Sequence, residues 1–425
     1  MRIVEGFPSA KAILTRQAPS KLYESDSEQV VRQIIADVRD RGDKALFEYT
    51  SKFDGVKLTS LKVNKEQIAG AYEQVDAELV SALKLAAERI SVFHIRQKES
   101  LLRESTEQGS GWMIHPLDRV GIYAPGGTAP LSSSLLMTVI PAKVAGVSEI
   151  IVVTPPGAGG VVSPATLIAA DIAEVDRIFS VGGAQAITAL AFGTKSIPKV
   201  DKICGPGNSF VVLAKKMVYG VVGIDALQGP SEILIIADET ANPEYCAADL
   251  LAQAEHDPLA SAILITTSRQ LADKVSQEVK QQLKDLPRQA IANESFENQG
   301  MIVTVDSMAE AIELANLYAP EHVCLMVDRA TAYVDQLRNA GCIFVGENSV
   351  VVLGDYVAGP SHVLPTEGTA RFSSPLNVSD FIKLSNLITV DDTSLKELGQ
   401  AALTMARAEG LEAHARAVEK RLKPD

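Results

Sequence analysis

The sequence has few cysteines, and none of them form a recognisable pair. Cys204, Cys246, Cys324 and Cys342 are widely spaced, and no C-x-x-C motif occurs in the 425 residues. A zinc knot built from thiolates and a disulfide framework both depend on closely patterned cysteines. We therefore exclude these two scaffolds and interpret the four side chains as core thiols in a reducing compartment.

Long apolar runs are missing as well. No uncharged stretch reaches the ~18 apolar residues of a membrane-spanning helix. The first eight residues, MRIVEGFP, contain neither a long apolar core nor a small-residue cleavage site. We expect a soluble, cytoplasmic protein without a membrane partner.

Positive charge is scarce and scattered. The chain has 40 Lys and Arg against 53 Asp and Glu, a formal net charge of −13, and no basic block stands out. Nucleic acids and anionic membranes attract clustered positive charge. Neither partner is expected, and chemistry on a small molecule becomes the leading hypothesis.

The length and texture of the chain indicate several units. At ~150 residues per domain, two or three domains are expected. Residues 21–114 are rich in charged residues and Ala, with apolar residues at helical spacing between Val30 and Val38. We divide the chain into an amino-terminal arm (1–20), a mostly helical region that packs with the second α/β domain (21–114), a first Rossmann-like domain (115–230), a second one (231–380), and a helical carboxyl-terminal tail (381–425).

Two sets of short β-rich runs alternate with Ala-rich helical stretches. The first set is 120–123, 150–154 and 177–181; the second is 232–237, 262–266, 301–305, 323–327 and 342–345. Alternating strands and helices predict right-handed βαβ units and parallel sheets. The predicted fold is therefore α/β, with two Rossmann-like parallel-sheet domains that meet near Gly229-Pro230.

Four of the six histidines lie among polar and charged residues. They are His256, His322, His362 and His414. Imidazole titrates near neutral pH and is the commonest protein ligand of zinc. Acid–base catalysis, a metal site, or both are therefore indicated.

Gln253 and His256 follow a strong helix start. Asn242 is a good N-cap and Pro243 suits the first helical position, while Pro258 predicts an end at Asp257. Residues three apart share a helical face, so Gln253 and His256 can address a common point. Capping of carbonyl groups at the helix end explains them equally well.

His414 and Asp355 each have two interpretations. His414 shares a helical face with Leu411 and Ala415, which favours a buried, hydrogen-bonded histidine. Asp355 follows the apolar run 350–353, where a parallel strand would end, and carboxylates at such ends line ligand crevices. An aspartate bonded to the backbone of a turn is comparably consistent with the sequence.

Glu321 and His322 are adjacent polar residues that enter an apolar strand. Burying them without a function would be expensive. This pair is the strongest catalytic candidate, since either side chain can act as a general base. A structural salt bridge is the alternative.

Glycine-rich turns follow several β-like runs. They are Gly126-Gly127, Gly182-Gly183, 205–208 and 229–232. Such turns bring backbone N–H groups close to phosphates. None is a G-x-G-x-x-G motif or a P-loop, so ordinary tight turns explain each of them equally well.

Together these strings resemble the histidinol dehydrogenases nearly end to end. Seven occur in the family's order: YAPGG at 123–127, IPAKVAGV at 140–147, GPGN at 205–208, GPSE at 229–232, QAEH at 253–256, APEH at 319–322 and SHVLPT at 361–366. The resemblance implies NAD-dependent oxidation of L-histidinol to L-histidine through the aldehyde, the last step of histidine biosynthesis. It also implies one zinc ion per subunit, and a homodimer with shared active sites to which the tail contributes.

The resemblance further assigns roles to individual residues. It implies that Gln253, His256, Asp355 and His414 bind zinc, with His414 reaching across the dimer interface. His322 would be the base and Glu321 would activate water. Ser231, His362 and Glu409 would contact the substrate, together with the zinc ligands and His322, and Tyr123, Gln185 and Asn208 would hold NAD in the first Rossmann-like domain.

Two enzymatic alternatives and one noncatalytic alternative accompany this interpretation. The same scaffold could oxidise another alcohol, such as a sulfonated one. A zinc hydrolase that uses Glu321 and a metal-bound water would not need NAD. A noncatalytic nucleotide- or metal-binding protein would show no turnover.

Overall fold

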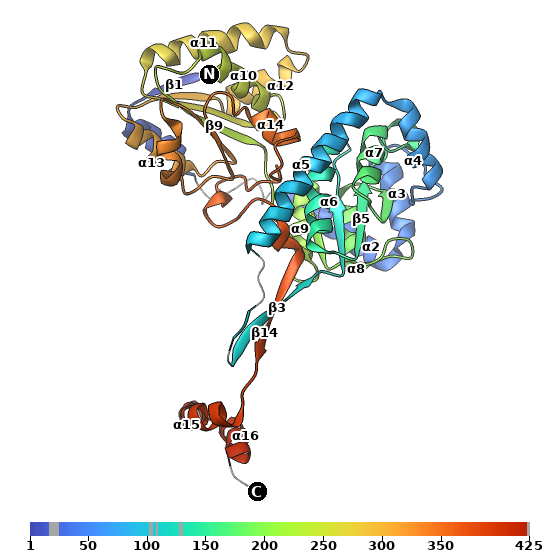
Figure 1. Ribbon diagram of the computed structural model, residues 1–425. Coiled ribbons are helices and arrows are strands. Elements are labelled where there is room, and N and C mark those ends of the chain that lie inside the picture. Colours follow the sequence, from blue (N-terminus) through green and yellow to red (C-terminus); the bar gives the residue numbers. More distant parts are fainter. Residues whose placement is uncertain (17–24, 102–104, 108, 127–130, 423–425) are drawn as a thin grey trace.

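The computed structural model describes residues 1–16, 25–101, 105–107, 109–126 and 131–422. In this part of the chain, two parallel sheets are flanked by helices, and a small antiparallel sheet leads to two helices at the carboxyl terminus (Figure 1). The predicted α/β fold with two Rossmann-like domains is confirmed. No helix among the described residues is both long and apolar enough to span a bilayer.

The six-stranded sheet has the order β1-β11-β10-β9-β12-β13, and all its pairs are parallel. Its strands are β1 (Arg2–Glu5), β9 (Glu232–Ala237), β10 (Ser261–Thr266), β11 (Met301–Thr304), β12 (His322–Met326) and β13 (Cys342–Val345). Residues 2–5, expected as part of a separate arm, form an edge strand of this sheet, and residues 17–20 lie outside the described part. Val4 is buried against the core, which explains why the segment joins the sheet.

The central strand β9 is apolar on both faces. Ile233 and Ile235 pack with α10 (Pro243–Ala254), α11 (Arg269–Gln282) and α12 (Gln289–Asn298). Leu234 and Ile236 pack on the other face with α1 (Phe7–Leu14) and α13 (Met308–Tyr318). A parallel strand covered by helices on both sides is expected to be continuously apolar.

The five-stranded sheet has the order β6-β5-β4-β7-β8 and is also parallel. Its strands are β4 (Arg119–Tyr123), β5 (Glu149–Thr154), β6 (Arg177–Ser180), β7 (Lys202–Cys204) and β8 (Gly223–Ile224). Its own helices are α6 (Ser132–Ala145), α7 (Pro164–Ile172), α8 (Gly183–Phe192) and α9 (Ser209–Val218). The strand order reverses between β4 and β7, and such a switch point forms a crevice at the carboxyl ends of the strands.

The predicted packing of the helical region is wrong. Its helices are α2 (Ser25–Arg41), α3 (Asp43–Phe53), α4 (Lys65–Ala71) and α5 (Ala77–Leu101). These helices cover the five-stranded sheet, α2 and α3 beside α8 and α9, and α5 beside α6 and α7 (Figure 1). The apolar spacing locates the buried face of a helix but carries no information on which sheet covers that face.

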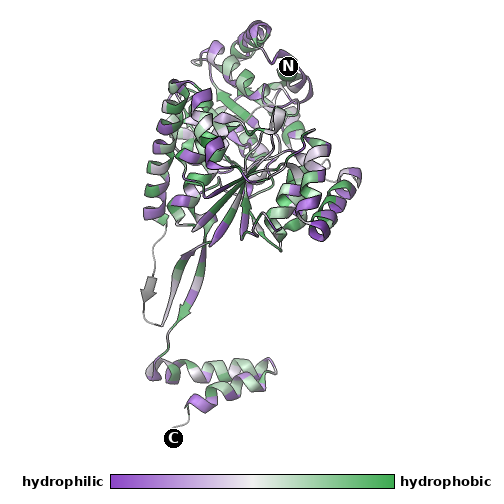
Figure 2. Cartoon of the chain, turned by 90° about the vertical axis from the view of Figure 1, so that its right-hand side faces the viewer, coloured by the Kyte–Doolittle hydropathy of each residue, from purple (hydrophilic) through white to green (hydrophobic). Residues whose placement is uncertain are grey.

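The segment after Phe381 begins with a strand, although a helix was expected. Strand β14 (Ile382–Ile388) pairs antiparallel with β3 (Ser110–Pro116), which also pairs with β2 (Ser105–Glu107). The tail then continues as α15 (Asp392–Ala408) and α16 (Glu412–Leu422), which pack on each other. Both views place these two helices away from the two parallel-sheet domains (Figure 2).

Short helical turns complete the chain. They are α14 (Val351–Tyr356) and the 3₁₀ turns η2 (Tyr72–Gln74), η3 (Ala158–Gly160), η4 (Leu283–Asp285), η5 (Ala330–Gln336), η6 (Thr369–Arg371) and η7 (Val378–Phe381). Helix α14 occupies the position where a strand was expected before Asp355. A run of four apolar residues does not distinguish a strand from a short helix, and here only Val351 is buried.

Candidate active site

The candidate catalytic pair lies at the amino ends of two neighbouring strands. His322 is the first residue of β12 and pairs with Ile233 near the start of β9, and Ser231 immediately precedes β9. The expectation of a crevice at the carboxyl ends of the strands is therefore wrong for this domain. Helix α10 runs back along the sheet, so Gln253 in its last turn also reaches this edge.

His322 is buried and held by one hydrogen bond. Its Nδ1 lies 2.8 Å from the carbonyl oxygen of Glu232. A carbonyl can only accept, so Nδ1 carries the proton and Nε2 carries the lone pair. Burial lowers the pKa of His322 to about 4, with His362 and His256 acting in the same direction. The ring is therefore neutral at pH 7.

The Nε2 atom of His322 has no hydrogen-bond partner among the described residues, although it is buried. It lies 3.9 Å from Oδ1 of Asp355. Buried polar atoms are normally satisfied, and an exception needs an explanation. A free lone pair beside a carboxylate is suited to receive a proton, because the negative charge stabilises the imidazolium that forms.

Glu321 lies on the other side of the same ring. Its Oε2 accepts a hydrogen bond from the backbone N–H of Glu232 at 2.8 Å and lies 3.6 Å from Nδ1 of His322. Burial raises the pKa of Glu321 well above its usual range, and the charges of Glu232 and Asp355 raise it further. A carboxylate with a raised pKa is a stronger base.

The helix that carries Gln253 starts as predicted. The Asn242 side chain accepts the N–H of Glu244, and Pro243 is the first helical residue. The helix ends at Ala254, three residues earlier than predicted, so His256 lies just beyond it with its N–H bonded to the carbonyl of Gln253 at 3.2 Å. Gln253 is buried.

Of the four predicted zinc ligands, His256 and Asp355 lie near His322, and Gln253 lies next to His256. The charge of His256 lowers the pKa values of His322 and His362, and Asp355 faces His322. Burial raises the pKa of Asp355 to about 6 and lowers that of His256. Among the described residues, no three His, Cys, Asp or Glu side chains are grouped closely enough to bind a metal. Gln253 is not of these types.

The fourth predicted ligand is remote within the chain. His414 lies in α16 and Glu409 caps α15; both are exposed and belong to the tail that extends from the parallel-sheet domains. The interpretation of His414 as a buried residue is wrong for this chain. On α16 only Ala415 is buried. The apolar face of α16 packs on α15 and leaves the neighbouring His414 uncovered.

His362 is half-buried and has partners on both ring nitrogens. Its Nδ1 donates to the carbonyl of Asp355 at 2.7 Å, so its Nε2 accepts from the hydroxyl of Ser134 at 2.9 Å. Ser134 lies on α6 of the five-stranded domain. The predicted substrate contacts Ser231 and His362 thus lie in the segments that adjoin the other domain.

The predicted NAD contacts lie at the carboxyl end of the five-stranded sheet. Tyr123 ends β4, and its hydroxyl accepts the N–H of Gly183 at 3.1 Å. Asn208 follows β7 and caps α9 by accepting two backbone N–H groups. Gln185 is buried, and its Oε1 has no partner among the described residues. Gly127 of the first glycine turn lies outside the described part.

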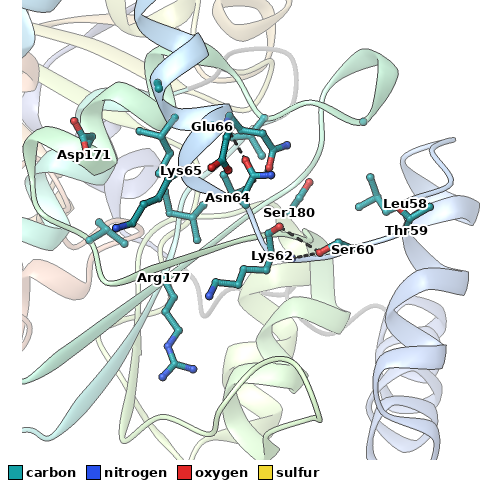
Figure 3. A pocket seen from close by; sticks show the side chains of 18 of the residues that line it. Leu58, Thr59, Ser60, Lys62, Asn64, Lys65, Glu66, Asp171, Arg177 and Ser180 are labelled. Atoms are coloured by element: carbon teal, nitrogen blue, oxygen red, sulfur yellow. Dashed lines mark hydrogen bonds between the residues drawn. The ribbon is translucent and has the colours of Figure 1, made fainter.

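A surface cavity lies elsewhere. It measures about 1500 Å³ and lies between α4 and the edge strand β6, lined by residues that include Lys62, Lys65, Asp171 and Arg177 (Figure 3). None of the predicted site residues lines it. A second cavity of about 510 Å³ includes Gly126 and Thr154 and adjoins the end of β4.

A profile of the histidinol dehydrogenase family matches residues 17–422. The chain belongs to this family. A histidinol dehydrogenase of Dehalococcoides mccartyi (strain CBDB1) is 54% identical and aligns over 99% of this chain and 100% of its own length. The corresponding protein of Deinococcus radiodurans is 50% identical over 99% of this chain and 97% of its own.

A solved structure agrees with the fold. The crystal structure of histidinol dehydrogenase from Elizabethkingia anophelis has 38% sequence identity and a TM-score of 0.94, covering 99% of this chain and 98% of that chain. The family consists of NAD-dependent oxidoreductases, so the predicted function, enzyme class and NAD cofactor are confirmed, as is the place in histidine biosynthesis.

Three residues near the site have no role among the predictions from sequence. Glu232 belongs there only to the GPSE string and to the start of the predicted strand 232–237, and Arg16 and Ser134 belong to none of the quoted strings. A buried carboxylate at the start of an apolar strand is the one signal that could have identified Glu232. Ser134 and Arg16 become visible only through contacts over long sequence distances.

Proposed function

We propose that, in oxidising L-histidinol to L-histidine through L-histidinaldehyde with two NAD⁺, this chain uses His322 as the base and Glu321 as the group that activates water. The observation that carries the assignment is the buried Nε2 atom of His322, which faces Asp355 and has no hydrogen-bond partner in the part of the chain that the structure describes. It supports a proton acceptor at this position.

In the first step, the hydroxyl proton of histidinol passes to Nε2 of His322, and hydride passes from the hydroxyl carbon to NAD⁺. The bond of Nδ1 to Glu232 keeps the lone pair on Nε2. Such a base contributes about 10²–10⁴ in rate. Holding the two reactants in line contributes ~7 kcal/mol or more.

In the second step, Glu321 removes a proton from the water that adds to the aldehyde. The hydrated aldehyde then loses hydride to a second NAD⁺. The raised pKa of Glu321 suits this task, because its carboxylate holds a proton more strongly than an exposed glutamate does.

Gln253, His256 and Asp355 would hold a zinc ion, with His414 of a second copy as the fourth ligand. Nitrogen and oxygen donors of these types suit zinc. When bound, zinc supplies a Lewis acid that fixes the imidazole and amine of the substrate. Of the three ligands from one chain, only His256 and Asp355 are of the His, Cys, Asp or Glu type. This accounts for the lack of a group of three such side chains among the described residues of one chain.

A homodimer accounts for the exposed apolar tail. Leu384, Ile388, Leu398 and Met405 are 61%, 76%, 58% and 64% exposed. Exposed apolar side chains on β14 and α15 indicate a protein partner, and a second copy would bring Glu409 and His414 to the site. Ser231, His362 and Glu409 would contact the substrate.

Tyr123, Gln185 and Asn208 would hold NAD at the switch point of the five-stranded sheet. The Oε1 atom of buried Gln185 has no partner among the described residues, which supports a polar ligand there. The four free cysteines are consistent with a reducing cytoplasm.

The test is stoichiometric. Purified protein is given limiting histidinol with excess NAD⁺, and the NADH formed is counted before chelation, after chelation, and after readdition of zinc. Two NADH per histidinol, lost with the chelator and restored by zinc, is the expected result. One NADH per substrate, or turnover that survives complete removal of metal, would contradict the proposal.

A further inference from the structure

One residue contacts both members of the candidate catalytic pair. The carbonyl of Glu232 accepts the Nδ1–H of His322 at 2.8 Å, and its N–H donates to Oε2 of Glu321 at 2.8 Å. Its carboxylate oxygen Oε2 accepts the backbone N–H of Glu321 at 3.3 Å. Three hydrogen bonds from the first residue of β9 therefore set the ring of His322 and both ends of Glu321.

The carboxylate of Glu232 is itself buried, with 3% of the residue exposed. Burial raises its pKa, and the neighbouring guanidinium of Arg16 opposes this shift. The Nη2 atom of Arg16 lies 2.7 Å from Oε1 of Glu232. The backbone N–H of Glu367 donates to the same oxygen at 3.2 Å. Arg16 thus compensates a charge that lies directly behind the catalytic pair.

Arg16 is held in one orientation by Tyr318. Its Nε donates to the Tyr318 carbonyl at 2.8 Å, and its guanidinium carbon lies 3.8 Å from the centre of the Tyr318 ring. Guanidinium groups stack on aromatic rings and form directed hydrogen bonds in a way that lysine does not. The side chain is 23% exposed, so it is largely removed from solvent.

The path of the amino-terminal segment explains how Arg16 reaches this place. Strand β1 runs parallel to β11, and α1 then returns along the sheet, with Ala10 and Leu14 buried. The return brings Thr15 and Arg16 to the amino ends of the strands, where Glu232 and His322 lie. The segment therefore connects to the site as well as adding an edge strand.

Strand β9 does not need the Arg16–Glu232 ion pair in order to be buried in the sheet. The other residues of β9 are apolar and buried, and burying a carboxylate with its counter-ion costs more than burying an apolar side chain. Orientation of neighbouring groups is the use that the contacts of Glu232 support.

We infer that Arg16 is a positioning residue: it compensates the buried charge of Glu232, so that the backbone of residue 232 holds the Glu321 carboxylate and the His322 ring in their reactive orientations. The inference rests on the proposed roles of Glu321 and His322. It makes turnover depend on a residue of the amino-terminal segment, which does not itself touch the reacting atoms.

The test compares kcat and KM of charge-altering variants in the full-length enzyme loaded with zinc. Arg16→Met leaves the Glu232 carboxylate without its cation next to Glu321, and we expect kcat to fall at least tenfold with the KM for NAD⁺ unchanged. Arg16→Lys keeps the charge but loses the bond to Tyr318, and a loss of a few-fold is expected.

The double variant Arg16→Met/Glu232→Gln gives the decisive comparison. It removes both charges and keeps the backbone contacts of residue 232, so kcat should recover to within about threefold of the wild type. If Arg16 were only a generic structural contact, the second substitution would lower kcat further. A double variant no faster than Arg16→Met would overturn the inference.

Lys11→Met is the matched control. Lys11 is a cation of the same segment, paired with Glu313 at the exposed surface, and its removal should leave kcat unchanged. If Arg16→Met does not fold, Arg16→Lys and the double variant decide, and wild-type kcat in Arg16→Lys together with a slow double variant would overturn the inference. Full turnover by His322→Asn would instead overturn the proposed function, so the two failures can be told apart.

Discussion

The hydroxyl of Ser134 lies 2.9 Å from Nε2 of His362 and joins the two parallel-sheet domains at the candidate site. A second contact reinforces this one, since the Ser361 hydroxyl donates to the carbonyl of Met137 at 3.1 Å. Both contacts are made by α6, the helix that follows β4 and the first glycine turn. The relative position of the five-stranded-sheet domain and the six-stranded-sheet domain is therefore set beside a predicted substrate contact.

Replacing Ser134 by Ala should destabilise the protein through His362. The substitution leaves an imidazole nitrogen of the half-buried His362 without its donor, which costs about 0.5–1.5 kcal/mol. In a double-mutant cycle with His362→Ala, we expect the two effects to be non-additive by about 0.5–1.5 kcal/mol, measured by urea unfolding. Thr138→Ala is the control, because this buried hydroxyl is one turn away and bonds only to the carbonyl of Ser134. Additive effects of Ser134→Ala and His362→Ala would show that the contact is energetically silent.

The sequence was sufficient to predict local features of this site. The N-cap Asn242 and the first-turn Pro243 define the start of α10, and this places Gln253 in its last turn. Glu321 and His322 were identified because two adjacent polar residues interrupt an apolar strand. Each of these signals depends on residues within about one helical turn or on a single strand.

The remaining features depend on contacts that local patterns do not encode. The run before Asp355 is too short for periodicity to separate a strand from a helix. The sequence also does not show which strands pair and in which direction they run, so it cannot tell at which end of the sheet the site lies. The ion pair of Arg16 with Glu232 spans more than two hundred residues. Only the resemblance indicated a role for the remote His414.

His322→Asn should abolish alcohol oxidation while the protein keeps its metal. Asparagine has no basic nitrogen to receive the hydroxyl proton, so the loss in kcat should be about 10²–10⁴-fold. Zinc content, measured by elemental analysis, should equal that of the wild type. Rapid single-turnover formation of NADH from histidinol in this variant would remove His322 from its proposed role.

Glu321→Gln should affect the second half-reaction more than the first. The amide keeps the size of the side chain but cannot remove a proton from water, so oxidation of added histidinaldehyde should slow about 10²-fold or more. Oxidation of histidinol to the aldehyde should slow much less, and pre-steady-state NADH traces separate the two. Equal losses in both half-reactions would contradict the division of roles between Glu321 and His322.

His94 should make the stability of the protein fall in mild acid. It is fully buried in α5, where burial lowers its pKa below the usual 6.5 and the bond to Gln97 opposes this only in part. As the pH falls through 6.5, the unfolded chain takes up a proton that the folded chain does not. The free energy of unfolding therefore decreases, by at most about 1.4 kcal/mol per pH unit for one group.

The measurement compares wild type and His94→Leu by urea unfolding at pH 7.5 and pH 5.5. Between these values the wild type should lose more stability than the variant, since the other titrating groups are common to both. The difference, and not the absolute stability, reports on His94. A larger acid loss in His94→Leu would show that the sign is wrong.

Lys215 organises the turn that ends at Asn208. Its ammonium group is fully buried, pairs with Asp225 at 2.5 Å and donates to the carbonyl of Gly205 at 3.0 Å. The other carboxylate oxygen of Asp225 accepts the N–H of Gly205 at 2.8 Å. Gly205 has a φ of +111°, and a Cβ atom there would lie 2.3 Å from the carbonyl oxygen of Tyr123. The buried pair therefore fixes a turn that packs directly against the end of β4.

Lys215→Met should have two effects: a lower free energy of unfolding and weaker binding of NAD⁺. Removing one partner of a buried ion pair leaves Asp225 uncompensated, at a cost of about 3–5 kcal/mol. The KM for NAD⁺ should rise about tenfold as the turn relaxes, an effect of roughly 1.4 kcal/mol, while the KM for histidinol stays near its original value. Lys215→Met/Asp225→Asn should recover most of the lost stability, because neither charge then remains.

Lys216→Met is the control on the same helix. The Lys216 side chain is 32% exposed, and its removal should cost less than about 1 kcal/mol. A rise in the KM for histidinol with no change for NAD⁺ would place this turn in the substrate site instead.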